Sequence, residues 1–512
     1  MRRGPGGRSG PGLNDWIRGL DAGTILIALL VIGLLVRVFI AAVLLPRSGF
    51  AIDIGDFSAW GQRLASIGPA GFYEPGYFSD YPPGYLYVLW VLGILGGALG
   101  PLVGQDATGA LVKIPGIVAD LGVAAMLFVI CRRWAGQLIA RAQAARFGLD
   151  GEGLGLLAAA VYLLNPGTIF NSAVWGQIDS VGTLLLLLTI YALGRGRTEL
   201  AAVGAVVALL VKFQFAFLVP VVAVVGIRRH LFGRSSDPAH DSERQPVRVL
   251  TSLAVAMVAM AALLLPFGMT LYTPLAGGDP TALLGFLPEA DPERSIVGKL
   301  MQAANTYTGL SINAFNLWRN PWSGLGDTLH WGDDTVAGLA ISGLVLTWQQ
   351  VGTLLFAAVA IVALWQVGRR DDTRGVLIAS LVLAIAFFAL PTRVHERYLF
   401  PAIALSAPLL LSGRAWPWVA GGISLSFFAN VYWVYTEDWS FAGGVMNPGL
   451  NGEPMRAPQF LTDTLFTDAG IWIVSAMILA VLAVVVWHSV QLALRPAWFD
   501  AASISAAERV HR

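Results

Sequence analysis

The stretch YLYVLWVLGILGGALGPLVG (85–104) is long and apolar enough to cross a membrane, and whether it crosses decides the topology of every later segment. If it does, the arginine-rich segments CRRWAGQLIARAQAARF (131–147) and GIRRHLFGR (226–234) face outward, against the positive-inside rule. If it does not, the inner segments hold 22 of the 33 basic residues. We therefore expect 85–104 to be a re-entrant or interfacial helix, with both termini in the cytoplasm.

The composition is that of a polytopic membrane protein. Of the 512 residues, 56% are hydrophobic and 13% are charged, whereas soluble proteins have about 25% charged residues. We expect an all-α fold of about 12 transmembrane helices, plus the helix at 85–104 in the first outer loop. The expected spans lie near 22–45, 109–131, 153–170, 178–194, 199–212, 213–228, 249–269, 350–367, 375–391, 398–412, 416–435 and 470–492.

These spans divide the chain into four parts. Residues 1–21 are expected to form a disordered cytoplasmic tail, and residues 22–412 a catalytic transmembrane module with large outer loops at 46–108 and 270–349. C-terminal transmembrane helices follow at 413–492, with an outer loop at 436–469, and then a cytoplasmic tail at 493–512. The apolar run at 22–45 is too long for a signal peptide, so we interpret it as an uncleaved first span in the plasma membrane.

Charge and motifs exclude several functions. A net charge of +1 provides no basic face for nucleic acid. The single cysteine, Cys131, excludes an intramolecular disulfide framework and any cysteine-rich metal site. The chain has no Walker or Rossmann glycine loop. With no clear cluster of metal ligands either, we expect no cofactor and no obligatory metal.

Unusual polar residues gather on the predicted outer side, where spans leave the membrane. A set of this kind, with carboxylates, amides, an imidazole and cations, indicates a site built at the membrane surface. Its members are Asp53, Asp56, Asp80, Gln177, Asp179, Lys212, Gln214, Asn313, Asn316, Arg393, His395, Glu396 and Arg397.

Each of these features also has an ordinary structural explanation. DYPPG (80–84) is a suitable turn because Pro-Pro stops a helix, and Asp179 or Ser180 is a suitable helix cap. The outer aromatic residues resemble an interfacial belt, and the cluster at 393–397 resembles a snorkelling patch. Asp120, two turns after Lys113 in a predicted span, is expected to make a buried structural contact rather than to do chemistry.

Several motifs, in order, resemble those of GT-C glycosyltransferases, which are membrane enzymes that use lipid-phosphate sugars. GDFSAWGQRLA (55–65), DYPPG, PGIVADLG (115–122) and Lys212-Phe213-Gln214 resemble motifs of dolichyl-phosphate-glucose glucosyltransferases. WGQID (175–179), NAFNLW (313–318) and HERYLFP (395–401) are closer to bacterial relatives of GPI-type mannosyltransferases. The resemblance covers roughly residues 50–400. In three places the chain departs from it: Gly84 and Arg397 stand where the family has Leu and Lys, and Phe213 is inserted between Lys212 and Gln214.

The resemblance implies a hexosyltransferase that moves one sugar, mannose or glucose, with inversion on the outer face of the membrane. The donor would be a polyprenyl-phosphate sugar, and the acceptor a glycan, glycolipid or protein. Asp56 would be the general base, with Asp80 and Asp53 as second choices. The donor phosphate and substrate would be bound by Arg393, His395, Glu396, Arg397, Lys212, Gln214, Gln177, Asp179 and Asn313.

Two other classes of function stay open from the sequence. A secondary transporter or flippase of lipid-linked saccharides would be expected to place charged or broken segments in mid-membrane, whereas the polar residues here collect at one rim. A non-enzymatic scaffold for cell-envelope assembly, such as a degenerate glycosyltransferase, is the third hypothesis. Only the joint presence of Asp56 and His395 argues against it.

Overall fold

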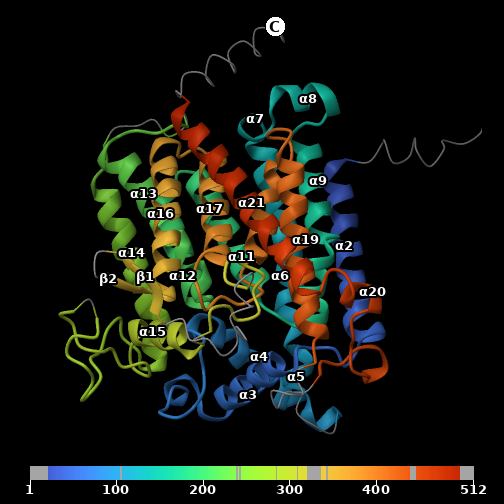
Figure 1. Cartoon of the computed structure of the whole chain (residues 1–512), viewed down its shortest axis with the longest axis vertical. Helices are drawn as coiled ribbons and strands as arrows, with labels where there is room; N and C mark the ends of the chain where they lie inside the picture. Colours follow the sequence, from blue (N-terminus) through green and yellow to red (C-terminus); the bar gives the residue numbers. More distant parts are fainter. Residues whose placement is uncertain are drawn as a thin grey trace, which may run out of the picture.

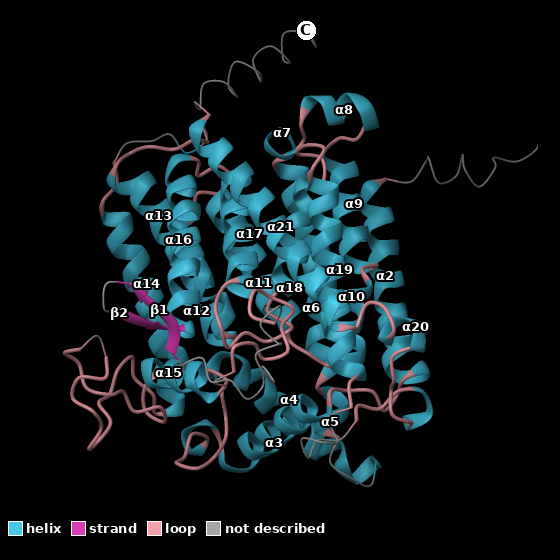
Figure 2. Ribbon diagram, in the orientation of Figure 1, coloured by secondary structure: helices cyan, strands magenta, loops and turns pink. Residues whose placement is uncertain are grey.

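Long helices stand side by side in a bundle, and shorter helices cover its lower end (Figure 1). The computed structural model describes residues 21–103, 107–237, 240, 244–283, 285–307, 309–319, 336–341, 344–438 and 446–495. Helices account for nearly all of its regular structure (Figure 2). The prediction of an all-α polytopic membrane protein is therefore confirmed.

Seven helical segments within the described residues are long and apolar enough to cross a membrane: Ala22–Leu44, Pro83–Leu102, Thr108–Arg133, Phe213–Leu231, Val247–Phe267, Trp348–Arg369 and Asp468–Leu494. Shorter apolar helices complete the bundle. The bundle is made of α2 (Ala22–Phe39), α6 (Lys113–Arg133), α9 (Gly151–Leu163), α11 (Asp179–Gly194), α12 (Thr198–Val211), α13 (Leu218–Gly226), α14 (Val247–Leu264), α16 (Trp348–Arg369), α17 (Thr373–Ala389), α18 (Phe400–Ser406), α19 (Trp416–Thr436) and α21 (Asp468–Leu494).

The connecting helices lie at opposite ends of this bundle. The small helices α7 (Ala135–Leu138) and α8 (Arg141–Phe147), in an arginine-rich connection, are at the upper end (Figure 1). At the lower end lie α3 (Ala51–Ile67), α4 (Pro83–Val103), α5 (Thr108–Leu111), α15 (Ile296–Thr306) and α20 (Gln459–Thr462). Helix α4, the segment that decides the topology, packs chiefly against α3 and touches the bundle through α12.

Two predicted spans differ from the structure. The predicted span 153–170 is a bent pair, Gly151–Leu163 and Pro166–Trp175, with an angle of 52° between its halves. The bend follows from Pro166, which has no amide hydrogen to continue the helix. The predicted span 398–412 is only the short helix α18 followed by a 3-10 turn that starts at Ala407-Pro408. Its side chains are buried inside the protein, so it packs in the core and is too short to cross a membrane alone.

The predicted outer loops have structure of their own. Helix α3 follows the first span, and α15 lies within the segment 270–349. In that segment the strands β1 (Val336–Ile341) and β2 (Leu344–Thr347) pair antiparallel, with Val336 opposite Thr347 and Ile341 opposite Leu344.

A fully buried ion pair joins α2 to α6. The Arg37 side chain donates from Nε to Asp120 at 2.8 Å and from Nη1 to the Leu163 carbonyl at 3.0 Å. Tyr162 donates its hydroxyl to the other Asp120 oxygen at 2.8 Å. Asp120 thus makes the buried structural contact expected of it, with Arg37 as its charged partner. Lys113 instead donates to Ser48 and the Ala173 carbonyl. Such a pair is stable inside a membrane because each charge is neutralised and hydrogen-bonded.

Two hydrophobic cores meet at the lower end of the bundle. The larger is built from the bundle helices, including α6, α9, α11, α17 and α19. The smaller joins α3 and α4 to the residues near α12 and α14, around Phe57, Trp60, Tyr81 and Tyr85. Eight of the thirteen polar residues that the sequence analysis singled out line a cavity between side chains of these two cores.

Candidate functional site

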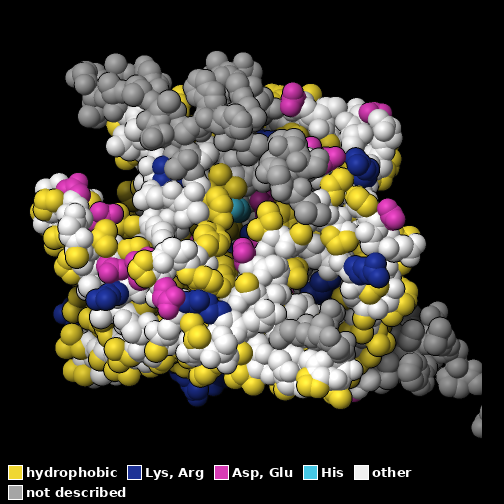
Figure 3. Space-filling model, turned by 90° about the horizontal axis from the view of Figure 1, so that it is seen from below, with side chains coloured by type: hydrophobic (Ala, Val, Ile, Leu, Met, Phe, Trp, Pro, Cys, Tyr) yellow, Lys and Arg dark blue, Asp and Glu magenta, His cyan; other side chains and the backbone are white. Residues whose placement is uncertain are grey.

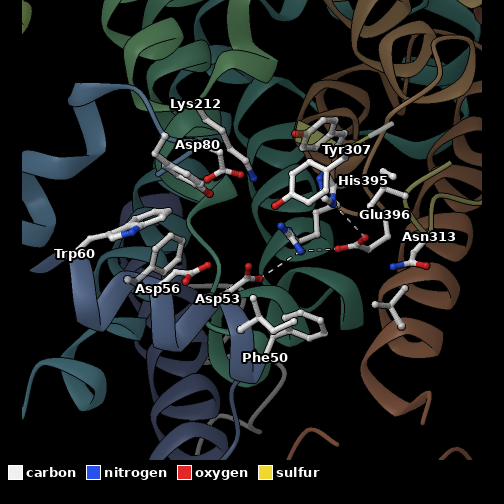
Figure 4. Close-up of a pocket in the computed structure, with 17 residues that line it drawn as sticks. Phe50, Asp53, Asp56, Trp60, Asp80, Lys212, Tyr307, Asn313, His395 and Glu396 are labelled. Carbon is white, nitrogen blue, oxygen red and sulfur yellow. Dashed lines mark hydrogen bonds and ion pairs between the residues drawn. The ribbon is translucent and has the colours of Figure 1, made fainter. Parts of the chain in front are cut away.

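A cavity of about 290 Å³ opens where the two cores meet. Seen from below, the lower face is hollowed near its centre, with acidic and histidine side chains at the hollow (Figure 3). Labelled side chains from α3, the segment before α4, and the loop between α17 and α18 point toward one space (Figure 4). The lining residues are Phe50, Ile52, Asp53, Asp56, Phe57, Trp60, Asp80, Tyr81, Lys212, Tyr307, Ile312, Asn313, His395, Glu396, Arg397, Tyr398 and Val434.

Asp53 holds the walls of the cavity together. Its Oδ2 accepts hydrogen bonds from Trp175 Nε1 at 2.6 Å and Gln177 Nε2 at 2.7 Å. The same oxygen lies 3.3 Å from Arg397 Nη1. Because its charge and this oxygen are already engaged, Asp53 is an anchor between α3, the 170s turn and the 390s loop rather than a free carboxylate.

Asp56 lies one helical turn after Asp53, so both carboxylates point from the same face of α3. The Asp56 carboxylate makes no hydrogen bond or ion pair with any residue that the structure describes. Burial raises its pKa to about 6, and the nearby charges of Asp53 and Asp80 add to the effect. It is therefore a carboxylate with no counter-charge, facing the cavity.

Asp80 lies opposite, in the turn that leads into α4. Burial raises its pKa, and the neighbouring Asp53 adds to the rise, while Arg397 and Lys212 oppose it. Its position is held by the preceding residue, since Lys299 of α15 donates to the Ser79 carbonyl at 3.3 Å. As with Asp56, no side chain in the described part of the chain forms a hydrogen bond or ion pair with this carboxylate.

Lys212 enters the cavity from the end of α12 but its charge is already neutralised. Its Nζ donates to Asp179 Oδ1 at 2.6 Å, and Asp179 also accepts from Gln214 and Asn171. Asp179 is fully buried beneath the cavity, where a lone carboxylate would be costly. The Lys212 ammonium therefore neutralises the buried Asp179 carboxylate.

The loop between α17 and α18 supplies His395, Glu396 and Arg397. Arg397 Nη1 donates to Glu396 Oε1 at 2.5 Å, and its guanidinium lies over the Trp175 ring at 5.2 Å. Burial, together with the charges of Arg397 and Lys212, holds the pKa of His395 well below its usual range. The imidazole is thus neutral at pH 7, and its ring packs edge-on against Tyr307 at 4.7 Å between centroids.

The structure sorts the predicted site residues into three groups. Asp53, Asp56, Asp80, Lys212, Asn313, His395, Glu396 and Arg397 line the cavity. Gln177, Asp179 and Gln214 lie behind it and hold its lining residues in place. Arg393 turns away: it adopts a left-handed conformation, φ 62°, and donates to Ala304 and Asn305 at the end of α15.

Sequence reasoning missed the aromatic walls of the cavity. Tyr307, Trp60, Phe57 and Tyr398 line it. The sequence analysis assigned the outer aromatic residues to an interfacial belt. Phe57 and Trp60 lie within the motif GDFSAWGQRLA, and Tyr398 directly follows the charged cluster, so these three offered a signal, whereas Tyr307 offered none.

The lining of the cavity carries an excess of negative charge when its ion pairs are taken into account. Lys212 and Arg397 are the cations in its lining, and each has a carboxylate partner, whereas Asp56 and Asp80 have none. A ligand with a positive charge or several hydroxyl groups fits such a site, since it would supply the missing donors. Among the described residues, no group of three or more His, Cys, Asp or Glu side chains is arranged to hold a metal ion.

Residues 72–273 match the family of the GPI transamidase subunit PIG-U. This match covers less than half of the chain and runs from the turn before α4 through α14. It includes Asp80 and Lys212 of the cavity but neither α3 nor the 390s loop. No curated protein matches the chain.

The match corrects the predicted activity. The family is described as a subunit of a GPI transamidase, which is neither a sugar-transferring enzyme nor a transporter. The prediction of a hexosyltransferase acting on a polyprenyl-phosphate sugar is therefore wrong, as is the alternative of a transporter or flippase. The comparisons give no support for the resemblance to GT-C glycosyltransferases. The long apolar helices themselves indicate a multi-pass membrane protein, with the lipid bilayer as a partner.

Proposed function

We propose that this chain is a non-catalytic membrane subunit that binds the amine-bearing head group of a glycolipid and presents it to a catalytic partner chain. The observation that carries the proposal is the pair of carboxylates, Asp56 and Asp80, which face the cavity without a counter-charge. An ammonium group would supply that charge and form charge-assisted hydrogen bonds to both carboxylates.

The PIG-U match agrees with this ligand class. GPI is a glycosylphosphatidylinositol, a phospholipid that carries a glycan, and a transamidase joins an acyl group to an amine. A subunit of such an enzyme that holds a glycolipid by its head-group amine would keep the lipid in place for the partner. The aromatic lining is suited to a lipid head group at the membrane surface.

The side chains at the cavity support a binding role rather than catalysis of amide transfer. That chemistry uses a nucleophile with an adjacent base. The cavity lining in the described residues contains no serine, threonine or cysteine. The single cysteine, Cys131, is fully buried near the far end of α6. A partner chain would therefore supply the nucleophile.

The test compares two lipids that differ only at the amine. One is phosphatidylinositol carrying glucosamine, and the other is the same lipid with the amine acetylated. We expect the purified chain in detergent to bind the amine form at least about tenfold more tightly, since one charged hydrogen bond contributes about 1.5–3 kcal/mol. Native mass spectrometry or thermophoresis would measure both constants. Equal affinities would refute the proposal.

As part of this proposal, both ends of the chain lie on the cytoplasmic side of the plasma membrane and the cavity opens outward. The inner side would then hold α8, whose Arg141 is exposed, and the outer side α20 with Asp463 just after it. We expect Asp463→Cys to react with a membrane-impermeant maleimide in intact cells, and Arg141→Cys to react only after permeabilisation. Native Cys131 is buried and provides the unlabelled background. The reverse pattern would overturn this orientation.

A further inference from the structure

Three arginines gather at the upper ends of α17, α19 and α21, at the opposite end of the bundle from the cavity (Figure 1). Arg374 lies in the first turn of α17, Arg414 precedes α19, and Arg495 directly follows α21. Arg374 donates from Nη2 to the Ser412 carbonyl at 3.5 Å, which places it beside the loop that carries Arg414. Arg414 and Arg495 are exposed. We call these three arginines the upper arginine cluster.

A stacked pair of rings holds the ends of α19 and α21 together at this place. The buried Trp416 indole, at the start of α19, lies on the His488 imidazole of α21, with 5.3 Å between the ring centroids and 28° between the planes. The charges of Arg374 and Arg495 both act on the His488 imidazole, so these two guanidiniums lie near the ring pair. The upper arginine cluster is therefore built on a packed junction of three helices. Like charges held this close repel one another, and an anion between them would remove that repulsion.

The three helices supply no carboxylate at this end. Helices α17 and α19 contain no aspartate or glutamate, and α21 has only Asp468, its first residue, at the lower end. The two carboxylates that precede α17 are engaged elsewhere. Asp371 pairs with Arg229 at 2.6 Å, and Asp372 pairs with Arg370 at 3.0 Å. Positive charge thus exceeds negative charge at this junction.

Exposed apolar side chains lie at the same level as the upper arginine cluster. Trp418, in the first turn of α19, is 83% exposed. Trp487 and Leu494 of α21, each next in sequence to a cationic or imidazole side chain, are 63% and 61% exposed. Tryptophan is enriched at the depth of lipid head groups, where its ring meets both acyl chains and water. A free anion would not use this apolar surface, whereas a phospholipid would use it for its acyl chains.

The chemistry of arginine selects the anion. A guanidinium donates two parallel hydrogen bonds to a phosphate, which makes arginine the preferred partner of that group. Basic pockets between membrane helices near the cytoplasmic surface are suited to anionic lipid head groups.

We propose that the upper arginine cluster binds the head group of an anionic phospholipid, with its phosphate among the three guanidiniums and its acyl chains along Trp487 and Leu494. This site is separate from the cavity and goes beyond the proposed function, because the lipid here is held by its negative charge. With both ends of the chain on the cytoplasmic side, the bound lipid belongs to the inner leaflet.

The experiment titrates the purified full chain in detergent micelles with two lipids of equal chain length. Short-chain phosphatidylglycerol has an anionic head group, and short-chain phosphatidylcholine has a head group without net charge. We expect phosphatidylglycerol to bind at least about tenfold more tightly. Arg414→Gln combined with Arg495→Gln should lower its affinity at least about tenfold and leave phosphatidylcholine binding unchanged. Because both arginines are exposed, the thermal unfolding midpoint of this variant without lipid should match wild type.

The matched control is Arg141→Gln combined with Arg146→Gln, which removes the same charge from exposed residues of α8 at the same end of the molecule. It should lower phosphatidylglycerol affinity less than about twofold. Equal affinities for the two lipids in wild type would overturn the proposal. An equal loss of phosphatidylglycerol affinity in the two double variants would also overturn it, because the attraction would then be independent of the cluster.

Glycerol 3-phosphate separates a lipid site from a site for a free anion. It has the phosphate without acyl chains, and we expect it to bind at least about a hundredfold more weakly than phosphatidylglycerol. Binding as tight as that of the lipid would contradict the assignment. The variant with Arg414→Gln and Arg495→Gln should keep the wild-type preference for the glucosamine lipid over its acetylated form, so a failure of this inference leaves the proposed function standing, and the reverse.

Discussion

Replacing Asp56 and Asp80 together by asparagine is expected to lower the affinity for the glucosamine lipid by at least about a hundredfold. Each carboxylate would lose one charge-assisted hydrogen bond to the ammonium, about 1.5–3 kcal/mol, and each 1.4 kcal/mol corresponds to a factor of ten. Asparagine has nearly the same shape, and neither carboxylate accepts a hydrogen bond from a described side chain, so the cavity should keep its form. Lipid titration of the purified variant measures the change.

The control for this variant is Asp463→Asn, which removes an exposed carboxylate at the same end of the molecule and should leave affinity unchanged.

The pH dependence of lipid affinity provides a second check on Asp56. Because the pKa of Asp56 is raised to about 6, the carboxylate is ionised above that pH and protonated below it. Wild-type affinity for the amine lipid should thus fall about tenfold from pH 7 to pH 5. Asp56→Asn should show a smaller fall, and an equal one would contradict the role of Asp56.

Asp120→Ala is expected to lower the free energy of unfolding by about 3–5 kcal/mol, because it leaves Arg37 buried without its counter-charge. The Tyr162 hydroxyl would lose its acceptor as well. Unfolding of the variant in detergent micelles, followed by circular dichroism, measures the loss.

A paired replacement separates the charge from the packing. Arg37→Met with Asp120→Leu removes both charges and fills most of the space, so it should recover most of the lost stability. A comparison variant, Lys113→Met, removes a nearby cation that does not contact Asp120 and should cost less. If Asp120→Ala changed unfolding by under about 1 kcal/mol, the ion pair would not be the link between α2 and α6 that the geometry indicates.

Much of the fold could be predicted because apolar length alone marks a membrane helix. The run at 22–45 became the helical segment Ala22–Leu44, and the runs at 350–367 and 470–492 became α16 and α21, with few changes at their ends. Apolar length failed where a segment is buried inside the protein rather than in lipid. The run at 398–412 is as apolar as a span, yet prolines 401 and 408 limit it to a short core helix. Hydropathy does not distinguish lipid from protein interior.

That these polar residues lie together was also readable from the sequence, and their electrostatics were not. Asp56, Asp80 and His395 stood out as polar residues at one rim, and they line one cavity. Their charge balance depends on pairings across the fold, such as Lys212 with Asp179 and Arg397 with Asp53. From its sequence alone, the loop at 393–397 resembles a phosphate-binding site. In the structure, Arg393 points away from the cavity and the His395 imidazole is neutral.

The most direct test of this account is the ratio of affinities for the glucosamine lipid and its acetylated form, measured side by side at pH 7 on the full chain. We predict a ratio of at least about ten for wild type and near one for the variant with both Asp56→Asn and Asp80→Asn. A wild-type ratio near one, or a ratio that survives the loss of both carboxylates, would contradict the claim that these two residues bind the amine.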